Sequence, residues 1–238
     1  LIRIPSHIVS VVFFLLSLPL IHLNPHWNVT ISLLFLILVY HEMLNLSESA
    51  NIKKTIFKMG FFLGLMIMID YNFFWFYFII LISLMYYSQF SWNHCFIQML
   101  GLIYPIIFYY ALYVLNDNIP CISMELNKAF HHREYYFNDY PIYLLIILLL
   151  LILATKELYT NYYRKTEKAK KGFNLLFFFS LLIILQSVFS HSLQFIHLLI
   201  LPFTIMISNY LIYLKHKKFR TFLLGLLFIS FMFKFYYL

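Results

Sequence analysis

Long apolar runs follow one another along nearly the whole chain, and this feature constrains the fold most. A hydrocarbon core needs about 20 apolar residues per helix, with about 17 as the lower bound. Nine runs come near that length, at roughly 5–22, 29–45, 56–70, 72–89, 96–115, 141–155, 173–190, 193–214 and 221–238. They lack the alternation of apolar and polar residues that a barrel strand shows. The sequence therefore predicts an all-α fold, a polytopic transmembrane helix bundle with eight or nine membrane segments.

The low charge content predicts a single membrane domain. Of the 238 residues, 63% are hydrophobic and 11% are charged, whereas soluble domains carry about 25% charged residues. Because no polar stretch is long enough to fold alone, we expect residues 1–238 to form one integral membrane domain. The chain starts without a methionine and without a signal-peptide pattern, and we expect a further N-terminal part to precede it.

The basic residues predict the orientation of this domain. If the first residues are cytoplasmic, then 14 of the 17 Lys and Arg residues fall on connections that face the cytoplasm. Short cytoplasmic loops of membrane proteins are rich in these residues. The loops around 45–58, 156–172 and 215–220 are therefore predicted to be cytoplasmic, and 116–140 to face the other compartment. Basic loops of this kind face anionic headgroups, so the expected partners are membrane lipids and not nucleic acid.

The polar loop 116–140 and one turn supply the candidate catalytic residues. The loop is predicted to lie on the outer membrane surface as an interfacial helix. Carboxylates and imidazoles suit acid–base chemistry, and a guanidinium suits phosphate binding. The candidates are Asp70, Glu125, His131, His132, Arg133 and Glu134. Their spacing matches no metal-binding or catalytic motif, so no metal and no cofactor are expected, and solvated loop groups remain the simpler interpretation.

Gly60 and Gly64 form a GxxxG pattern inside an apolar run. Small residues four positions apart allow two helix backbones to approach closely in lipid. The pattern therefore predicts helix packing at these two residues. Packing within the same bundle is favoured over a homodimer face.

Several local patterns resemble a bacterial family of uncharacterised multi-pass inner-membrane proteins, seen chiefly in Bacteroidota. They are the Gly-Phe-x-x-Gly-Leu helix at 60–65, the turn Phe-Ser-Trp-Asn-His at 90–94, the Gly-Leu-Ile-Tyr-Pro run at 101–105, and two closing helices joined by a basic turn at 198–229. At 93–94 the chain has Asn and His where the family has a basic and an acidic residue. The resemblance implies a membrane protein of the cell envelope and supplies no known reaction.

Three functions follow from these features. The leading hypothesis is a non-catalytic or accessory component of the bacterial inner membrane, with other envelope membrane proteins as further partners. The alternative is a glycosyltransferase-like enzyme that acts on lipid-linked sugars through the outer loop, and the third is a transporter. Whether the chain is an enzyme stays open at this level.

Overall fold

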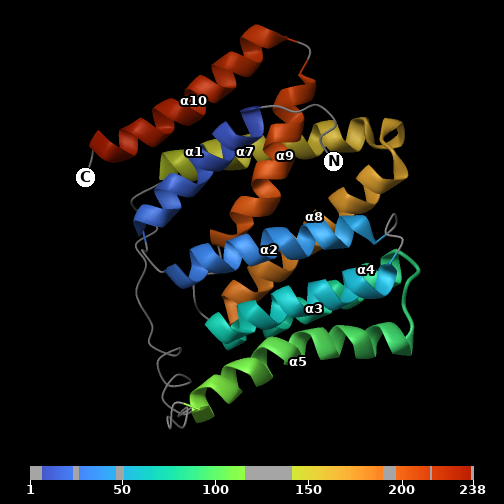
Figure 1. Ribbon diagram of the computed structural model, residues 1–238. Helices are drawn as coiled ribbons and strands as arrows, with labels where there is room; N and C mark the ends of the chain where they lie inside the picture. Colours follow the sequence, from blue (N-terminus) through green and yellow to red (C-terminus); the bar gives the residue numbers. More distant parts are fainter. Residues whose placement is uncertain are drawn as a thin grey trace. The chain divides into compact units, whose positions relative to one another are not determined.

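The computed structural model describes residues 7–23, 27–46, 51–115, 141–189, 197–214 and 216–236, and their regular structure is helical (Figure 1). Within these ranges the chain forms nine α-helices and short 3-10 turns, and no strand. Each of the nine predicted segments overlaps one of the α-helices. The prediction of an all-α fold is therefore confirmed.

The chain divides into two compact units. Unit 1 contains α1 (His7–Leu23), α7 (Pro141–Thr160), η3 (Tyr162–Arg164), α8 (Glu167–Phe189) as far as residue 183, α9 (Ile200–Tyr213) and α10 (Lys217–Tyr236). Unit 2 contains α2 (Trp27–Asn45), α3 (Ile52–Ile69), η1 (Tyr71–Trp75), α4 (Phe76–Tyr86), α5 (Trp92–Leu115) and the end of α8. That residues 1–238 form one integral membrane domain stays a prediction.

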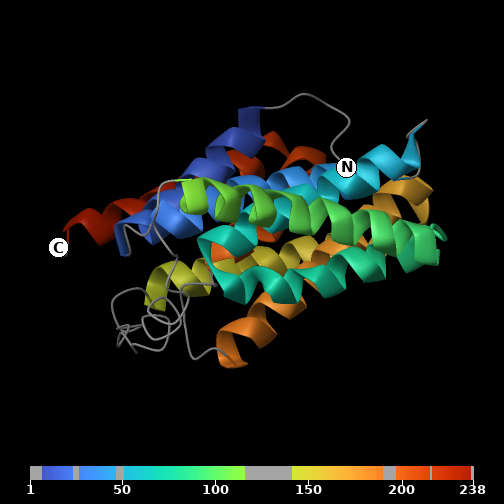
Figure 2. The same cartoon turned by 60° about the horizontal axis from the view of Figure 1, so that its bottom comes forward.

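Helix α3 is the centre of unit 2 and packs against both α5 and α2 (Figures 1 and 2). The side chains buried on α2 and α3 recur every three or four positions, which is the spacing of one helix face. They include Leu36, Val39 and Met43 on α2, Leu46 directly after it, and Ile56, Met59, Leu63 and Met66 on α3. These two apolar faces form the core of this part of unit 2.

Helix α9 is the centre of unit 1, as α3 is of unit 2, and it packs against α1 and α7. It is buried on nearly all sides. Pro202 falls in its first turn, where the missing N–H breaks no helical hydrogen bond. The buried residues of α9 include three polar ones, Thr204, Ser208 and Asn209.

Two helices of the described ranges are long and apolar enough to cross a membrane, namely Trp92–Leu112 of α5 and Glu167–Ser187 of α8. Other apolar helices in these ranges are shorter, such as Thr30–Asn45 and His197–Tyr213. Eight or nine membrane segments therefore remain a prediction.

Candidate functional site

Asp70, the one catalytic candidate within the described ranges, lies in the turn between α3 and η1. Its Oδ1 atom accepts hydrogen bonds from the backbone N–H and from the side-chain amide of Asn72, both at 2.9 Å. Burial raises the pKa of Asp70 above its ordinary value, and the two bonds from Asn72 oppose that rise. The carbonyl oxygen of Asn72 in turn accepts a 2.7 Å hydrogen bond from Gln186 at the end of α8. The side chain of Asp70 therefore holds a turn that anchors three helices of unit 2.

The other five candidates, Glu125, His131, His132, Arg133 and Glu134, lie outside the described residues. So does the whole predicted interfacial helix at 116–140. Their roles stay predictions.

Gly60 and Gly64 lie where α3 crosses α5. A Cβ atom on Gly60 would come within 3.0 Å of the carbonyl oxygen of Gln98, and one on Gly64 would meet the carbonyl oxygen of Leu102. Gly101 on α5 stands in the same relation to the carbonyl oxygen of Phe57 on α3. The close approach is thus made by glycines from both helices, and α5 of the same chain covers Gly60 and Gly64.

The turn at 90–94 is a helix cap. The hydroxyl oxygen of Ser91 accepts a 3.2 Å hydrogen bond from the backbone N–H of His94, as N-cap serines do. The Nδ1 atom of His94 lies 2.5 Å from the carbonyl oxygen of Gln89. Because a carbonyl only accepts, Nδ1 must carry the proton. Asn93 and His94 therefore lie in the first turn of α5. The turn before this helix contains Ser88, whose backbone is in the left-handed region with φ 58°.

An ion pair joins α2 and α3 in unit 2. The ammonium group of Lys58 lies 3.0 Å from Oε1 of Glu42, whose side chain is 11% exposed. A buried carboxylate needs such a partner, because its transfer from water to the protein interior costs several kcal/mol. Removing one partner of a buried ion pair destabilises a protein by about 3–5 kcal/mol. Glu42 is therefore a structural charge, and it explains an acidic residue within an apolar run.

A second polar group of side chains lies in unit 1, at the end of α7. Glu157 lies in the last turn of that helix. Its Oε1 atom accepts a 3.1 Å hydrogen bond from the amide of Asn161, and its Oε2 atom lies 3.4 Å from the amide nitrogen of Asn209 on α9. We call Glu157, Asn161 and Asn209 the Glu157 cluster.

Asn209 is the buried member of this cluster. Its side chain is fully buried, and its Oδ1 atom has no hydrogen-bond partner among the residues that the structure describes. The hydroxyl oxygen of Thr204, earlier on the same helix, is also buried without a partner in those ranges. Buried polar atoms are nearly always hydrogen-bonded in folded proteins. Both oxygens are therefore buried polar atoms that are not hydrogen-bonded within the described ranges.

Two of the basic residues that follow α7, Lys165 and Lys170, contact groups other than Glu157. Lys165 lies between two aromatic rings, 5.3 Å from the centroids of both Phe173 and Tyr213. Lys170 forms a 2.8 Å ion pair with Glu167 and lies over the ring of Tyr162. Part of the positive charge of this loop is therefore used in contacts within the protein.

The sequence analysis missed the Glu157 cluster because it treated 156–172 only as a basic loop. Two signals were available. Glu157 and Asn161 are four positions apart, the spacing at which helical side chains meet. The apolar run before residue 213 also contains Thr204, Ser208 and Asn209, and polar residues within apolar helices usually face a protein interior.

One family model matches residues 4–238 of the chain, and its description is "Family of unknown function (DUF6427)". Comparison with curated proteins and with solved structures gives no match. The resemblance to an uncharacterised family is thereby confirmed. The chain belongs to this family of unknown function, DUF6427.

Proposed function

We propose that the chain is a multi-pass integral protein of the bacterial inner membrane, with eight or nine segments, that acts as a non-catalytic or accessory component of the cell envelope. The observation that carries the proposal is the inverted polarity of α5. Most of its exposed side chains are large and apolar, whereas the residues on its buried side include Gln98, Gly101 and Pro105. Soluble helices have the opposite arrangement.

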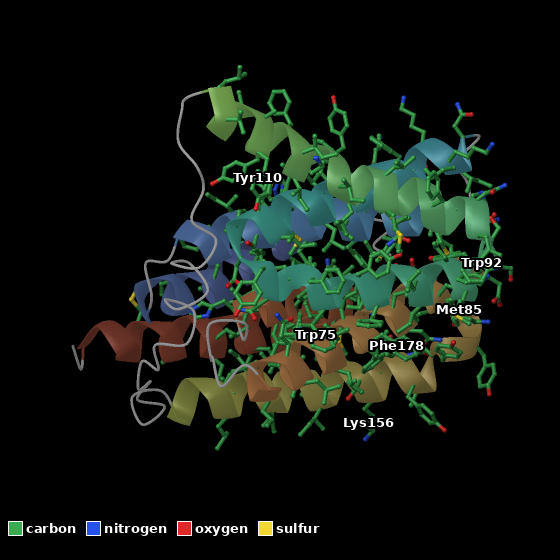
Figure 3. The ribbon with its side chains drawn as sticks, turned by 90° about the horizontal axis from the view of Figure 1, so that it is seen from below. Trp75, Met85, Trp92, Tyr110, Lys156 and Phe178 are labelled. Carbon is green, nitrogen blue, oxygen red and sulfur yellow. The ribbon has the colours of Figure 1, made fainter. Side chains whose placement is uncertain are left out.

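The extent of this exposure supports lipid as the surrounding medium. The exposed fractions are 63% at Phe96, 62% at Ile107 and 60% at Phe108. Only 22% of the apolar span of α5 is buried, and 39% of that of α8, so neither is the enclosed core helix of a soluble protein. Trp92 and Tyr110 lie toward opposite ends of α5 (Figure 3), where amphipathic rings meet the two interfaces of a bilayer.

The accessory role rests on the sequence, which has no nucleotide motif and no ligand spacing. Glycosyltransferase-like chemistry would need Asp70 as an acidic group of the outer face. Because Oδ1 of Asp70 already accepts two hydrogen bonds from Asn72, the geometry favours a structural role for this residue. No observation on the described residues favours the enzyme over the accessory component.

Lysine substitution on the exposed face of α5 tests the membrane proposal. At a water-exposed site, Ile107→Lys should change stability by less than about 0.5 kcal/mol. If the side chain faces lipid, the same change makes insertion of the helix into the membrane less favourable by about 2.5–3.5 kcal/mol. We expect Ile107→Lys to lower the amount of protein that resists alkaline carbonate extraction from membranes.

The matched control is Asn93→Lys, at an exposed position in the first turn of the same helix. We expect it to accumulate like the parent, because a lysine near the interface can extend its ammonium group into water. An Ile107→Lys variant that resists carbonate extraction in the same amount as the parent would contradict the proposal.

A further inference from the structure

Two basic segments of unit 1, residues 156–171 and 215–220, carry the whole net charge of the chain. They hold ten of the 17 Lys and Arg residues and two of the nine Asp and Glu residues, so their net charge is +8. The net charge of the complete chain is also +8, which means that all other residues together are neutral. We call these two ranges the basic segments of unit 1.

The structure places the two basic segments next to each other, although most of α8 and all of α9 separate them in the sequence. The ammonium group of Lys165, in the first segment, lies 5.3 Å from the ring centroids of both Phe173 and Tyr213. Tyr213 is the last residue of α9, and Lys217, in the second segment, is the first residue of α10. Because consecutive Cα atoms are about 3.8 Å apart, the Cα atoms of Tyr213 and Lys217 are at most about 15 Å apart. The cation–π contacts of Lys165 therefore hold the first segment beside the second.

Bringing the two segments together concentrates positive charge in one place. Like charges that lie close together destabilise the folded chain by repulsion. The rule that orients short loops in a membrane requires both segments to be cytoplasmic, but it does not require them to be neighbours. Glu167 already pairs with Lys170, whereas the side chains of Lys217 and Lys218 are exposed. The combined surface therefore has an excess of positive charge that an external anion can balance.

Exposed aromatic rings in and beside the basic segments indicate which kind of anion fits. Tyr159 and Tyr163 are 85% and 88% exposed, and Phe219 and Phe222 at the start of α10 are exposed as well. Tyrosine rings are enriched at the headgroup level of a bilayer, and phenylalanine rings enter the boundary with the acyl chains. A soluble phosphate would contact only the cationic groups, whereas a phospholipid can contact the cationic groups and the rings together.

We infer that the two basic segments of unit 1 form one binding surface for the headgroups of anionic phospholipids. Ammonium and guanidinium groups from both segments bind the lipid phosphates, and the exposed rings lie among the headgroups. The inference rests on the membrane location proposed above. It goes further than a general attraction of basic loops to a membrane, because it assigns lipid binding to two segments that the fold of unit 1 brings together.

The test measures the Tm of the detergent-solubilised full chain while phosphatidylglycerol is added to the micelles, with zwitterionic phosphatidylcholine as the control lipid. A ligand that binds only the folded state raises its stability. We expect phosphatidylglycerol in tenfold excess over its Kd to raise the Tm by about 3–6 °C. Phosphatidylcholine should not produce this increase. The dependence of Tm on the amount of lipid gives the Kd of each variant.

Charge removal from either segment should weaken this binding, because each lysine near an anionic surface contributes about fivefold in affinity. Lys217→Gln combined with Lys218→Gln should raise the Kd by about 25-fold, and Lys168→Gln in the first segment by about fivefold. The matched control is Lys53→Gln combined with Lys54→Gln, which removes two adjacent exposed lysines from the first turn of α3 in unit 2. It should keep the Kd of the parent. Glutamine has nearly the helix propensity of lysine, so the helices of all these variants should form.

Equal effects of phosphatidylglycerol and phosphatidylcholine on the Tm of the parent would overturn the inference. An increase of the same size with inorganic phosphate at equal ionic strength would also overturn it, because the anion would then be a soluble one. If the control variant loses as much affinity as the α10 variant, binding depends only on total charge and the surface is refuted. If Lys168→Gln keeps the Kd of the parent, the two segments do not form one surface. Resistance of the parent to alkaline carbonate extraction would leave the membrane proposal standing in each of these cases, so the two proposals can fail separately.

Discussion

Adding a single methyl group to each glycine at the α3–α5 crossing is the perturbation whose cost the structure predicts best. At Gly60 and Gly101 the nearest atoms to a new Cβ are backbone atoms of the facing helix, and at Gly64 they include Cγ of Pro105 at 2.6 Å. Backbone atoms cannot rotate aside as the end of a side chain can. Gly60→Ala, Gly64→Ala and Gly101→Ala must therefore push the two helices apart.

The distance by which α3 and α5 must move apart determines the loss of stability. An ordinary Cβ contact is at 3.4 Å or more and the new one would be under 3.0 Å, so the helices must move apart by several tenths of an ångström to about 1 Å. A gap of that size forfeits a quarter to a half of each contact worth about 0.1–0.2 kcal/mol, or about 2–4 kcal/mol over roughly fifty contacts. Alanine returns up to about 1 kcal/mol through its helix propensity. The expected net loss is about 1–3 kcal/mol for each variant.

Gly225 on α10 is the matched control, because a Cβ atom there meets nothing within 4 Å. Gly225→Ala should gain up to about 1 kcal/mol from helix propensity. Thermal unfolding in detergent measures the difference, at about 2–4 °C per kcal/mol for a chain of this size. If Gly60→Ala and Gly225→Ala change the Tm with the same sign, the close crossing is refuted. A parent dimer that becomes monomeric in Gly64→Ala without loss of stability would instead support a homodimer face.

Two further changes test single buried groups of unit 2. Burial raises the pKa of Asp70, so its contribution to stability is complete below the unfolded pKa of about 3.9 and is lost as pH rises through the higher folded pKa. Asp70→Asn keeps an acceptor for Asn72 and should remove this loss, so the stability of the variant relative to the parent should increase as pH rises. A stability difference between variant and parent that is the same at all pH values would contradict the assigned pKa direction. Gln98 is fully buried, and neither of its amide atoms has a hydrogen-bond partner within the described ranges. Gln98→Met should therefore raise the free energy of unfolding by about 1 kcal/mol or more. A lower Tm of this variant would mean that a polar partner binds the amide.

The sequence was sufficient for the helices because their signal is local. Apolar runs located all nine α-helices to within several residues, as at 141–155 against Pro141–Thr160 and at 29–45 against Trp27–Asn45. The largest difference is at 193–214, where α9 starts only at Ile200. Pro202 was the available signal, since proline is favoured in the first turn of a helix.

Tertiary contacts were beyond such reasoning, because they join residues far apart in the sequence. The GxxxG pattern identified Gly60 and Gly64 as packing residues, but its partner Gly101 on α5 has no neighbouring small residue to mark it. Glu157 and Asn209 are 52 positions apart, and only the fold of unit 1 brings them together. Asp70 was selected for its charge, whereas the structure gives its oxygen a capping role.

Cysteine accessibility tests the central claim most directly, namely that the chain crosses the membrane repeatedly with its basic loops in the cytoplasm. Cys95→Ser and Cys121→Ser give a background without cysteine, in which Asn127→Cys and Lys168→Cys are made one at a time. Spheroplasts are treated with a membrane-impermeant maleimide before and after permeabilisation. The account predicts that the Asn127→Cys variant reacts in intact spheroplasts and that the Lys168→Cys variant reacts only after permeabilisation. Labelling of Lys168→Cys in intact spheroplasts, with none of Asn127→Cys, would contradict it.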